Sequence, residues 1–387
     1  MRIRCLGWMA TAALTLASPA SVPSTAVASS TLTPTVSACP GLGAYALDSA
    51  VSAVSPTNAW AVGYSGRSLI EHWNGRHWTC ARSPSPGVSV LQAVGARPRD
   101  AWAVGYYFKS GSHIQHPLLL HWNGSRWSLV RGPGAAIETQ LTGVAVLSAT
   151  DAWAVGSYCP RFCGNPYAKQ FSLILHWNGK RWARVASPSP CDGPNLLHGV
   201  AAVSRRSAWA VGECDTGSAI HYQLVLHWNG TAWRIARLPQ ARSQGSTLWA
   251  VTAISNTDAW AAGQRYLANG YTRATLILHW NGSRWSRVTS PDPGIFHNFL
   301  EGISAATASD VWAVGEEDNP GLGGLLTLHW DGHSWSNIPN NFASGNPVVS
   351  VGANPRGGAW IAGYSNGGGC ALPVLLHWKN GKWSQTC

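Results

Sequence analysis

The chain has 387 residues, of which 23 are tryptophan and 11% are charged, and its formal net charge is +11. The Lys and Arg residues are dispersed along the sequence, which argues against nucleic acid as a partner of an exported chain. No stretch after the N-terminal segment is apolar for long enough to cross a bilayer as a helix, so we expect no membrane span. The excess positive charge has two interpretations. It belongs to solvated outer strands, or it attracts anionic cell-wall polymers or polysaccharides.

The first 28 residues have the parts of a secretory signal. Arg2 and Arg4 give a basic start, Cys5–Ala17 is apolar, and Ala26-Val-Ala28 is a small-residue cleavage site. Removing this segment takes away two arginines and lowers the formal charge from +11 to +9. Residues 29–46 are a leader and N-terminal extension, rich in Ser, Thr and Pro at its start, where we expect disorder. The mature protein is therefore expected to be secreted.

The mature chain is built on a tryptophan pattern that recurs seven times, with three Trp in each repeat. The first lies in Ala-Trp-Ala-Val-Gly or a near copy, at Trp60, Trp102, Trp153, Trp209, Trp260, Trp312 and Trp360. The second lies in His-Trp-Asn-Gly or a near copy, at Trp73, Trp122, Trp177, Trp228, Trp280, Trp330 and Trp378. The third follows five residues later, at Trp78, Trp127, Trp182, Trp233, Trp285, Trp335 and Trp383. A period near 50 residues indicates a solenoid or a propeller.

The third repeat shows the expected elements most clearly. Residues 141–148 and 152–156 read as two short strands joined by a turn, and residues 173–177 and 181–186 as two more. Asn178-Gly179 is a strong hairpin signal because both residues tolerate positive φ. Four antiparallel strands repeated seven times over residues 47–387 predict an all-β, seven-bladed β-propeller. We expect the lattice Trp side chains to pack between blades, and no strand exchange to close the ring.

Several repeated polar residues invite a chemical role that we consider structural. One histidine precedes the second Trp of each repeat, at His72, His121, His176, His227, His279, His329 and His377. Copies in adjacent blades would lie too far apart to share a metal ion. Aspartates at the turn between the first two strands are expected to bond their own backbone. We therefore expect no metal and no cofactor.

Eight cysteines remain after the signal: Cys39, Cys80, Cys159, Cys163, Cys191, Cys214, Cys370 and Cys387. An even number in an exported chain favours disulfides over metal ligation. A bond from Cys39 to Cys370 or Cys387 is our hypothesis for closing the ring.

The unit His121-Trp-Asn-Gly-Ser-Arg-Trp127 resembles the turn of Asp-box repeats in sialidase-type propellers. It is also similar to the Trp-rich blades of bacterial propeller lectins. Only Asp331 places an acid in this turn, and the arginine triad and Tyr/Glu pair of sialidases have no counterpart in the sequence. The lectin resemblance implies carbohydrate binding.

Function is expected where the repeat varies. One varying position lies two residues before a recurrent Val or Ile of each first strand, at Ser49, Gln92, Thr142, His198, Trp249, Glu301 and Val349. We expect this position to rim the central opening, on the face that carries the loops between the second and third strands. The loops also hold Glu213, His221 and Arg273. The candidate ligand-binding residues are Gln92, His198, Tyr222, Trp249, Arg265, Tyr266, Glu301, Glu316 and Glu317.

These residues favour a monomeric, non-enzymatic protein that binds glycan or an extracellular protein. An aromatic side chain beside an acid and an imidazole suits sugars, although Trp249 could simply plug the opening. The alternative is a glycoside hydrolase or lyase at the channel mouth, because Glu301 with Glu316 or Glu317 could form the required carboxylate pair. We assign no catalytic residue.

Overall fold

The computed structural model describes residues 47–134, 138–160, 168–216, 220–239, 245–319, 322–340, 348–354, 358–365 and 372–385. All of them belong to one compact unit, Thr35–Cys387. They form 28 strands and no helix, so no helix among these residues is long and apolar enough to cross a membrane. The predicted signal segment, the extension that follows it and the Cys39 hypothesis lie outside the described residues.

The strands follow one another in groups of four. The first strands of the groups are β1 (Leu47–Ser55), β5 (Val88–Arg97), β9 (Glu138–Ser148), β13 (Asn195–Ser204), β17 (Ser246–Ser255), β21 (His297–Thr307) and β25 (Val348–Ala353). The second strands are β2 (Asn58–Tyr64), β6 (Asp100–Phe108), β10 (Asp151–Cys159), β14 (Ser207–Asp215), β18 (Asp258–Tyr266), β22 (Asp310–Asn319) and β26 (Ala359–Ser365). The third strands are β3 (Ser68–Trp73), β7 (Gln115–Trp122), β11 (Phe171–Trp177), β15 (His221–Trp228), β19 (Arg273–Trp280), β23 (Leu322–Trp330) and β27 (Leu372–Lys379). The outer strands are β4 (Trp78–Cys80), β8 (Trp127–Leu129), β12 (Trp182–Val185), β16 (Trp233–Ile235), β20 (Trp285–Val288), β24 (Trp335–Asn337) and β28 (Lys382–Gln385).

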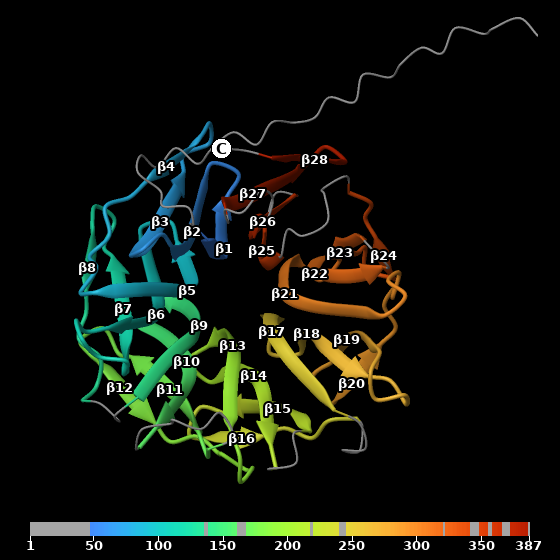
Figure 1. The fold of residues 1–387 in the computed structure, drawn as a ribbon, viewed down its shortest axis with the longest axis horizontal. Coiled ribbons are helices and arrows are strands. Elements are labelled where there is room, and N and C mark those ends of the chain that lie inside the picture. Colours follow the sequence, from blue (N-terminus) through green and yellow to red (C-terminus); the bar gives the residue numbers. More distant parts are fainter. Residues whose placement is uncertain are drawn as a thin grey trace, which may run out of the picture. The chain divides into compact units, whose positions relative to one another are not determined.

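Each group of four strands pairs in chain order and antiparallel (Figure 1). The groups of β17–β20 and β21–β24 are joined into one sheet by a single parallel pair, Arg273 with His297. The first strand of each group contacts the first strands of its two neighbours, and β1 contacts β25. The first and last groups each contain their own four strands, so the expectation of closure without strand exchange is confirmed for the described strands.

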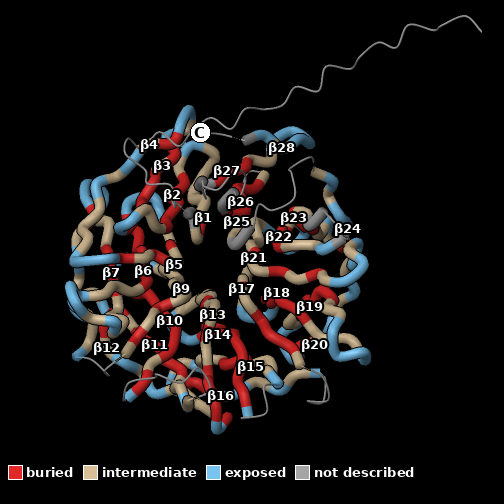
Figure 2. The backbone as a smooth tube through the Cα atoms, viewed as in Figure 1, coloured by how far each residue is buried: buried red, intermediate tan, exposed pale blue. Residues whose placement is uncertain are grey.

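The first Trp of each repeat is buried between its own four-strand unit and the next. Figure 2 shows buried residues along the middle strands of the units, such as β6, β10 and β14. The ring centroid of Trp102 lies 4.9 Å from that of Trp177 and 4.8 Å from that of Trp182 in the following unit. Equivalent clusters occur at the other junctions, and Trp360 contacts the Trp pair of the first unit in the same way. The prediction that the Trp lattice forms the inter-unit packing is confirmed.

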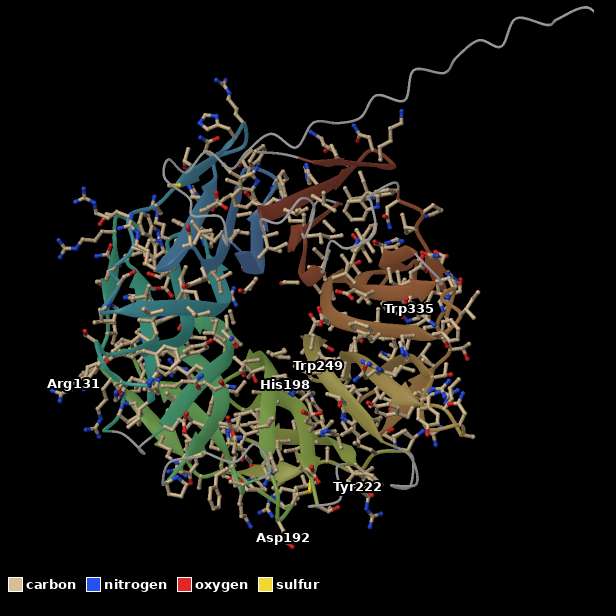
Figure 3. The ribbon with its side chains drawn as sticks, in the orientation of Figure 1. Arg131, Asp192, His198, Tyr222, Trp249 and Trp335 are labelled. Atoms are coloured by element: carbon tan, nitrogen blue, oxygen red, sulfur yellow. A yellow bond between two sulfur atoms is a disulfide. The ribbon has the colours of Figure 1, made fainter. Side chains whose placement is uncertain are left out.

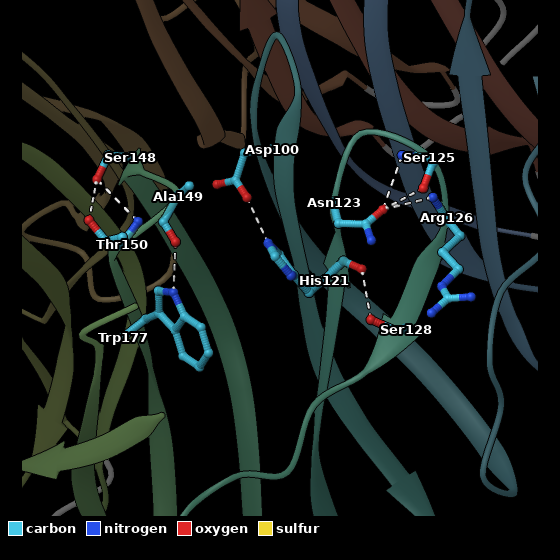
Figure 4. Close-up of polar contacts among 10 residues, drawn as sticks. All are labelled: Asp100, His121, Asn123, Ser125, Arg126, Ser128, Ser148, Ala149, Thr150 and Trp177. Atoms are coloured by element: carbon cyan, nitrogen blue, oxygen red, sulfur yellow. Dashed lines mark hydrogen bonds and ion pairs between the residues drawn. The ribbon is translucent and has the colours of Figure 1, made fainter. Parts of the chain in front are cut away.

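Each lattice histidine lies against the first Trp of its own unit, and all of them except His377 have a side-chain hydrogen bond among the described residues. The His121 ring stacks on Trp102 with centroids 4.3 Å apart, and its Nε2 is 2.6 Å from Asp100 Oδ1 (Figure 4). The same Asp–His bond of 2.9 Å joins His176 to Asp151, His279 to Asp258 and His329 to Asp310. These histidines are structural, as expected. The aspartates, however, accept these bonds from histidine, which corrects the expectation that their partner is their own backbone.

The turn between the third and outer strands differs from the predicted geometry in one respect. Asn123 Oδ1 accepts hydrogen bonds from the backbone N–H groups of Ser125 and Arg126, both at 3.1 Å (Figure 4), while Gly124 has a φ of 93°. Among the described residues Asn380 is the only non-glycine with positive φ, 53°. In the other turns, therefore, the asparagine, or Asp331 in the sixth unit, acts as a side-chain acceptor that fixes the turn, and glycine alone takes positive φ.

Candidate functional site

A β-bulge interrupts every first strand at the variable position identified in the sequence. The pairing of β13 with β14 passes from Leu197–Gly212 to Gly199–Val211, which leaves His198 without a partner in the ladder. The residues skipped in the same way in the other units are Ser49, Gln92, Thr142, Trp249, Glu301 and Val349. A bulge removes one residue from the pairing and changes the direction of its side chain. The backbone therefore sets these residues apart from the rest of the strand.

The glycine of the second strand makes the bulge possible. A Cβ at Gly212 would lie 1.9 Å from the carbonyl oxygen of Leu196, and one at Gly263 would lie 2.0 Å from that of Thr247. Such distances leave no room for a side chain, so glycine is required where the two backbones approach. The recurrent Ala-Trp-Ala-Val-Gly segment thus encodes a packing residue and a bulge together.

The bulge lies at the end of each unit from which the loop to the third strand departs. Asn195 at the start of β13 pairs with Cys214 near the end of β14, three residues before His198 along the inner strand. Figure 3 shows His198 and Trp249 at the inner side of the ring, whereas Tyr222 lies near its outer edge. The bulge residues of β13, β17 and β21 therefore belong to adjacent first strands, which contact one another in that order.

His198 and Trp249 are in direct contact and form the aromatic part of the site. Their ring centroids are 4.3 Å apart, with an angle of 35° between the planes. His198 Nε2 lies 3.7 Å from Oε1 of Glu213, whose side chain is 10% exposed. Thr247 Oγ1 donates to Glu213 Oε2 at 2.5 Å. The contact of 3.7 Å is longer than a hydrogen bond, and the buried Nε2 of His198 has no hydrogen-bond partner among the described residues.

The electrostatics of Glu213 favour the ionised carboxylate. Burial raises its pKa, but the nearby imidazole of His198, the hydrogen bond from Thr247 and the charge of His221 together bring the pKa below its usual value. His221 Nδ1 lies 3.5 Å from Glu213 Oε2, so two imidazoles face one carboxylate. Within the described part of the chain, only Oε2 of this carboxylate accepts a hydrogen bond, from Thr247, while Oε1 faces the His198 imidazole across 3.7 Å.

The environment of Glu301 differs from that of Glu213. Glu301 lies on β21, the first strand of its unit, which contacts β17, the strand that carries Trp249. Burial, and then the charge of Glu316, raise the pKa of Glu301 to about 8. Its buried Oε2 has no hydrogen-bond partner. Burial also raises the pKa of Glu316, opposed by the charge of Arg273 and supported by that of Asp318. Glu301 is therefore protonated at neutral pH and can donate a hydrogen bond.

Arg273 connects this acidic pair to the neighbouring unit. Its Nη1 donates to Gln264 Oε1 at 3.2 Å, and its guanidinium carbon lies 5.6 Å from the centroid of the Phe299 ring. Glu317, the next residue along β22, projects to the opposite side because side chains alternate along a strand. Glu316 is therefore the carboxylate that the structure associates with Glu301.

Three residues of the candidate set are not associated with the bulge residues. Tyr222 lies near the outer edge of the ring (Figure 3). Arg265 has the charges of Arg287 and Asp292 near it, which belong to β20 and the segment after it. The ring of Tyr266 lies against Gly245, which precedes β17. Gln92 does occupy a bulge, but in the second unit, away from the units of His198, Trp249 and Glu301.

Some residues of the site were assigned to the wrong element or missed in the sequence. Glu213 and Arg273 were expected in loops, but they lie within β14 and β19, because these strands extend beyond the short repeated segments. Thr247 was not identified. Its position in the sequence could have indicated it, because Thr247 lies two residues before the bulge residue Trp249, on the strand β17 that contacts the strand of Glu213.

A disulfide fixes the connection that leads into the first strand of the fourth unit. Cys191 and Cys214 are bonded, and Cys80 and Cys159 are also disulfide-bonded. The Asn195 side chain accepts a hydrogen bond from the Cys191 N–H and donates to the carbonyl oxygens of Cys191, Gly193 and Gln170. The backbone just before His198 is thus tied to its neighbours on several sides. Within the described residues, no group of three or more His, Cys, Asp or Glu is arranged to hold a metal ion.

The strands, their pairing and their ring of contacts define an all-β, propeller-like protein. No family model matches the chain, and no curated protein matches it.

Solved structures of propellers are similar in fold. The chain superposes on YCF48 bound to D1 peptide with a TM-score of 0.53 and 14% identity, covering 89% of this chain and 99% of that one. It superposes on the WD40 β-propeller domain of Doa1 with a TM-score of 0.56 and 10% identity, covering 87% and 93%. An ulvan lyase of polysaccharide lyase family PL25, bound to -[GlcA(1-4)Rha3S]-, gives 0.53 and 9%, covering 89% and 94%. At these identities the likeness shows the fold alone.

Proposed function

We propose that the chain is an exported, seven-bladed β-propeller that binds a glycan at the ring of bulge residues. Four strands in each of its repeated units, and the contact of β1 with β25, support the blade number. The cysteine pairs support an oxidising, extracellular location. The similar folds include one protein bound to a peptide and one bound to a polysaccharide, so the fold is compatible with either kind of ligand.

The observation that carries the proposal is the bulge that sets apart a different side chain in each unit. It presents His198, Trp249 and Glu301 from three consecutive first strands. Trp249 offers an apolar ring for the CH groups of a sugar. The protonated Glu301 and the imidazole of His198, whose Oε2 and Nε2 atoms are buried without a hydrogen-bond partner among the described residues, offer hydrogen bonds to hydroxyl groups.

A glycan array probed with the mature protein tests this function. Trp249→Ala should weaken binding to the recognised glycan by about tenfold, which corresponds to ~1.4 kcal/mol. Ile235→Ala is the control, because it truncates an exposed apolar side chain on the outer strand β16, away from the bulge residues, and it should change the affinity less than about twofold. Both variants should keep the melting temperature of the wild type. Unchanged binding in Trp249→Ala would count against the site, and an array without any hit would favour a protein ligand.

One observation favours an enzyme as the second candidate. Burial and the charge of Glu316 raise the pKa of Glu301 to about 8, which keeps a proton available at neutral pH. A protonated carboxyl beside a second carboxylate is the arrangement that glycoside cleavage uses. Glu301→Gln should then abolish the release of reducing ends from a bound glycan while the glycan still binds. A wild-type protein that leaves every bound glycan intact would exclude this alternative.

A further inference from the structure

An open groove lies on the outer side of the ring, between the second and third four-strand units. Its volume is about 630 Å³, and it is lined by residues 130–133, which follow β8, and residues 180–184, which lead into β12. Four of its nine lining residues are exposed cations: Arg131, Lys180, Arg181 and Arg184. Figure 3 shows Arg131 at the outer edge, far from His198 and Trp249. The groove is therefore separate from the bulge residues.

The carboxylates of the protein do not neutralise this groove. Asp100 and Asp151 of the two adjoining units are bonded to lattice histidines, and Asp151 also pairs with Arg205. Across the described residues, no ion pair joins Arg131, Lys180 or Arg181 to an acid. The seven outer strands contain no Asp or Glu at all. The positive charge is thus free to attract an anion.

Protection of a sheet edge does not account for the cluster. Basic side chains on an edge strand do prevent it from pairing with another sheet, and Arg184 lies on the edge strand β12. The guanidinium of Arg184 also lies 3.9 Å from the centroid of the Tyr158 ring. Arg131, Lys180 and Arg181 lie outside the strands, however, where no edge needs protection.

We propose that this groove binds an anionic polysaccharide whose sugars carry carboxylate or sulfate groups. The planar guanidinium groups can each form paired hydrogen bonds with such anions. Pro133 and Val130, both partly exposed, supply apolar atoms among the cations, which suits the CH faces of sugar rings. The groove joins two units, so an extended chain is a better occupant than a single small anion. This site does not depend on the function proposed for the bulge residues.

Two charge-matched triple variants of the mature protein test the proposal. The groove variant is Arg131→Gln, Lys180→Gln and Arg181→Gln, with Arg184 kept because it packs on a tyrosine. The control variant is Arg234→Gln, Arg284→Gln and Lys382→Gln, which removes two exposed arginines and one exposed lysine from three other units. Both should keep the wild-type melting temperature, because all six side chains are exposed.

Binding is measured by biolayer interferometry to polygalacturonate, chondroitin sulfate and neutral dextran. The wild type should bind at least one of the two anionic polymers but not dextran, and more weakly as NaCl rises from about 50 to about 300 mM. The groove variant should lose about tenfold in affinity and the control variant about twofold or less. Equal losses in the two variants would overturn the proposal, and so would no binding to either anionic polymer. Equally strong binding to single-stranded DNA would assign general polyanion attraction instead and would also overturn it.

Discussion

Replacing Glu301 by glutamine tests whether the bulge of β21 holds its carboxyl group in the protonated state. Burial and the charge of Glu316 raise the pKa of this group from 4.5 to about 8. Between these two pH values the folded protein keeps a proton that the unfolded chain has released. The free energy of unfolding therefore falls as the pH rises from about 4.5 to about 8, and the loss is complete above that range.

The size of the effect follows from the pKa. The rise from 4.5 to about 8 sets an upper bound of about 5 kcal/mol on the cost of ionising Glu301 in the folded state. Glu301 is only partly buried, so water screens its charge, and we expect about 1–3 kcal/mol. Glutamine keeps the shape and carries no charge. The variant therefore avoids the cost of about 1–3 kcal/mol, which for a chain of this length corresponds to a rise of about 1–4 °C in melting temperature.

Differential scanning calorimetry at pH 5 and pH 9 provides the measurement. Glu301→Gln should melt close to the wild type at pH 5 and higher than the wild type at pH 9. Asp192→Asn is the control, because that side chain is 98% exposed, and it should differ little from the wild type at either pH. If Glu301→Gln shifts the melting temperature equally at both pH values, the carboxyl group is not protonated in the folded state and the reasoning is wrong.

Three further predictions concern the scaffold. Gly263→Ala should destabilise the protein by about 3 kcal/mol in urea unfolding, because its Cβ would lie 2.0 Å from a carbonyl oxygen. The control Gly134→Ala should be nearly neutral, because nothing lies within 4 Å of the added Cβ. Replacing both Cys191 and Cys214 by Ala should lower the free energy of unfolding by about 3 kcal/mol, since the bond closes a loop with a sequence separation of 23; equal stability under reducing and oxidising conditions would contradict this. Trp209→Ala, which empties a site 1% exposed between two units, should cost about 3–5 kcal/mol, and a loss below about 1 kcal/mol would contradict the packing described here.

The strands could be predicted because each is marked by local residues. The Trp positions, the turn residues and the apolar alternation recur in every repeat, the second and third Trp always five residues apart, and the structure has strands where these signals lie. The bulge could not be predicted in the same way. It depends on how closely two backbones approach, and the sequence records this only as a glycine in the second strand and a variable residue opposite it, as with Gly212 and His198.

The partners of the candidate site were harder to predict than its positions. Glu213 and Arg273 come from strands that extend past the repeated segments, and nothing local marks where such a strand ends. Glu316 and Glu317 are neighbours in sequence but lie on opposite sides of β22, so the choice between them required the register. Arg265 was expected in a variable loop on the binding face, whereas it lies in β18 and its charged neighbours, Arg287 and Asp292, belong to the outer part of its own unit.

A strand residue usually pairs with its neighbour in the sheet and also presents its side chain. In the bulge, the residue that presents the variable side chain does not pair. A residue in the ladder is constrained by its partner on each side, but His198, Trp249 and Glu301 have no such partner. After a duplication of one ancestral module, each copy could therefore change this residue independently while its tryptophans stayed the same. Diversification of the ring would proceed one substitution at a time, and a library randomised at these positions alone could be screened for new ligands on an intact framework.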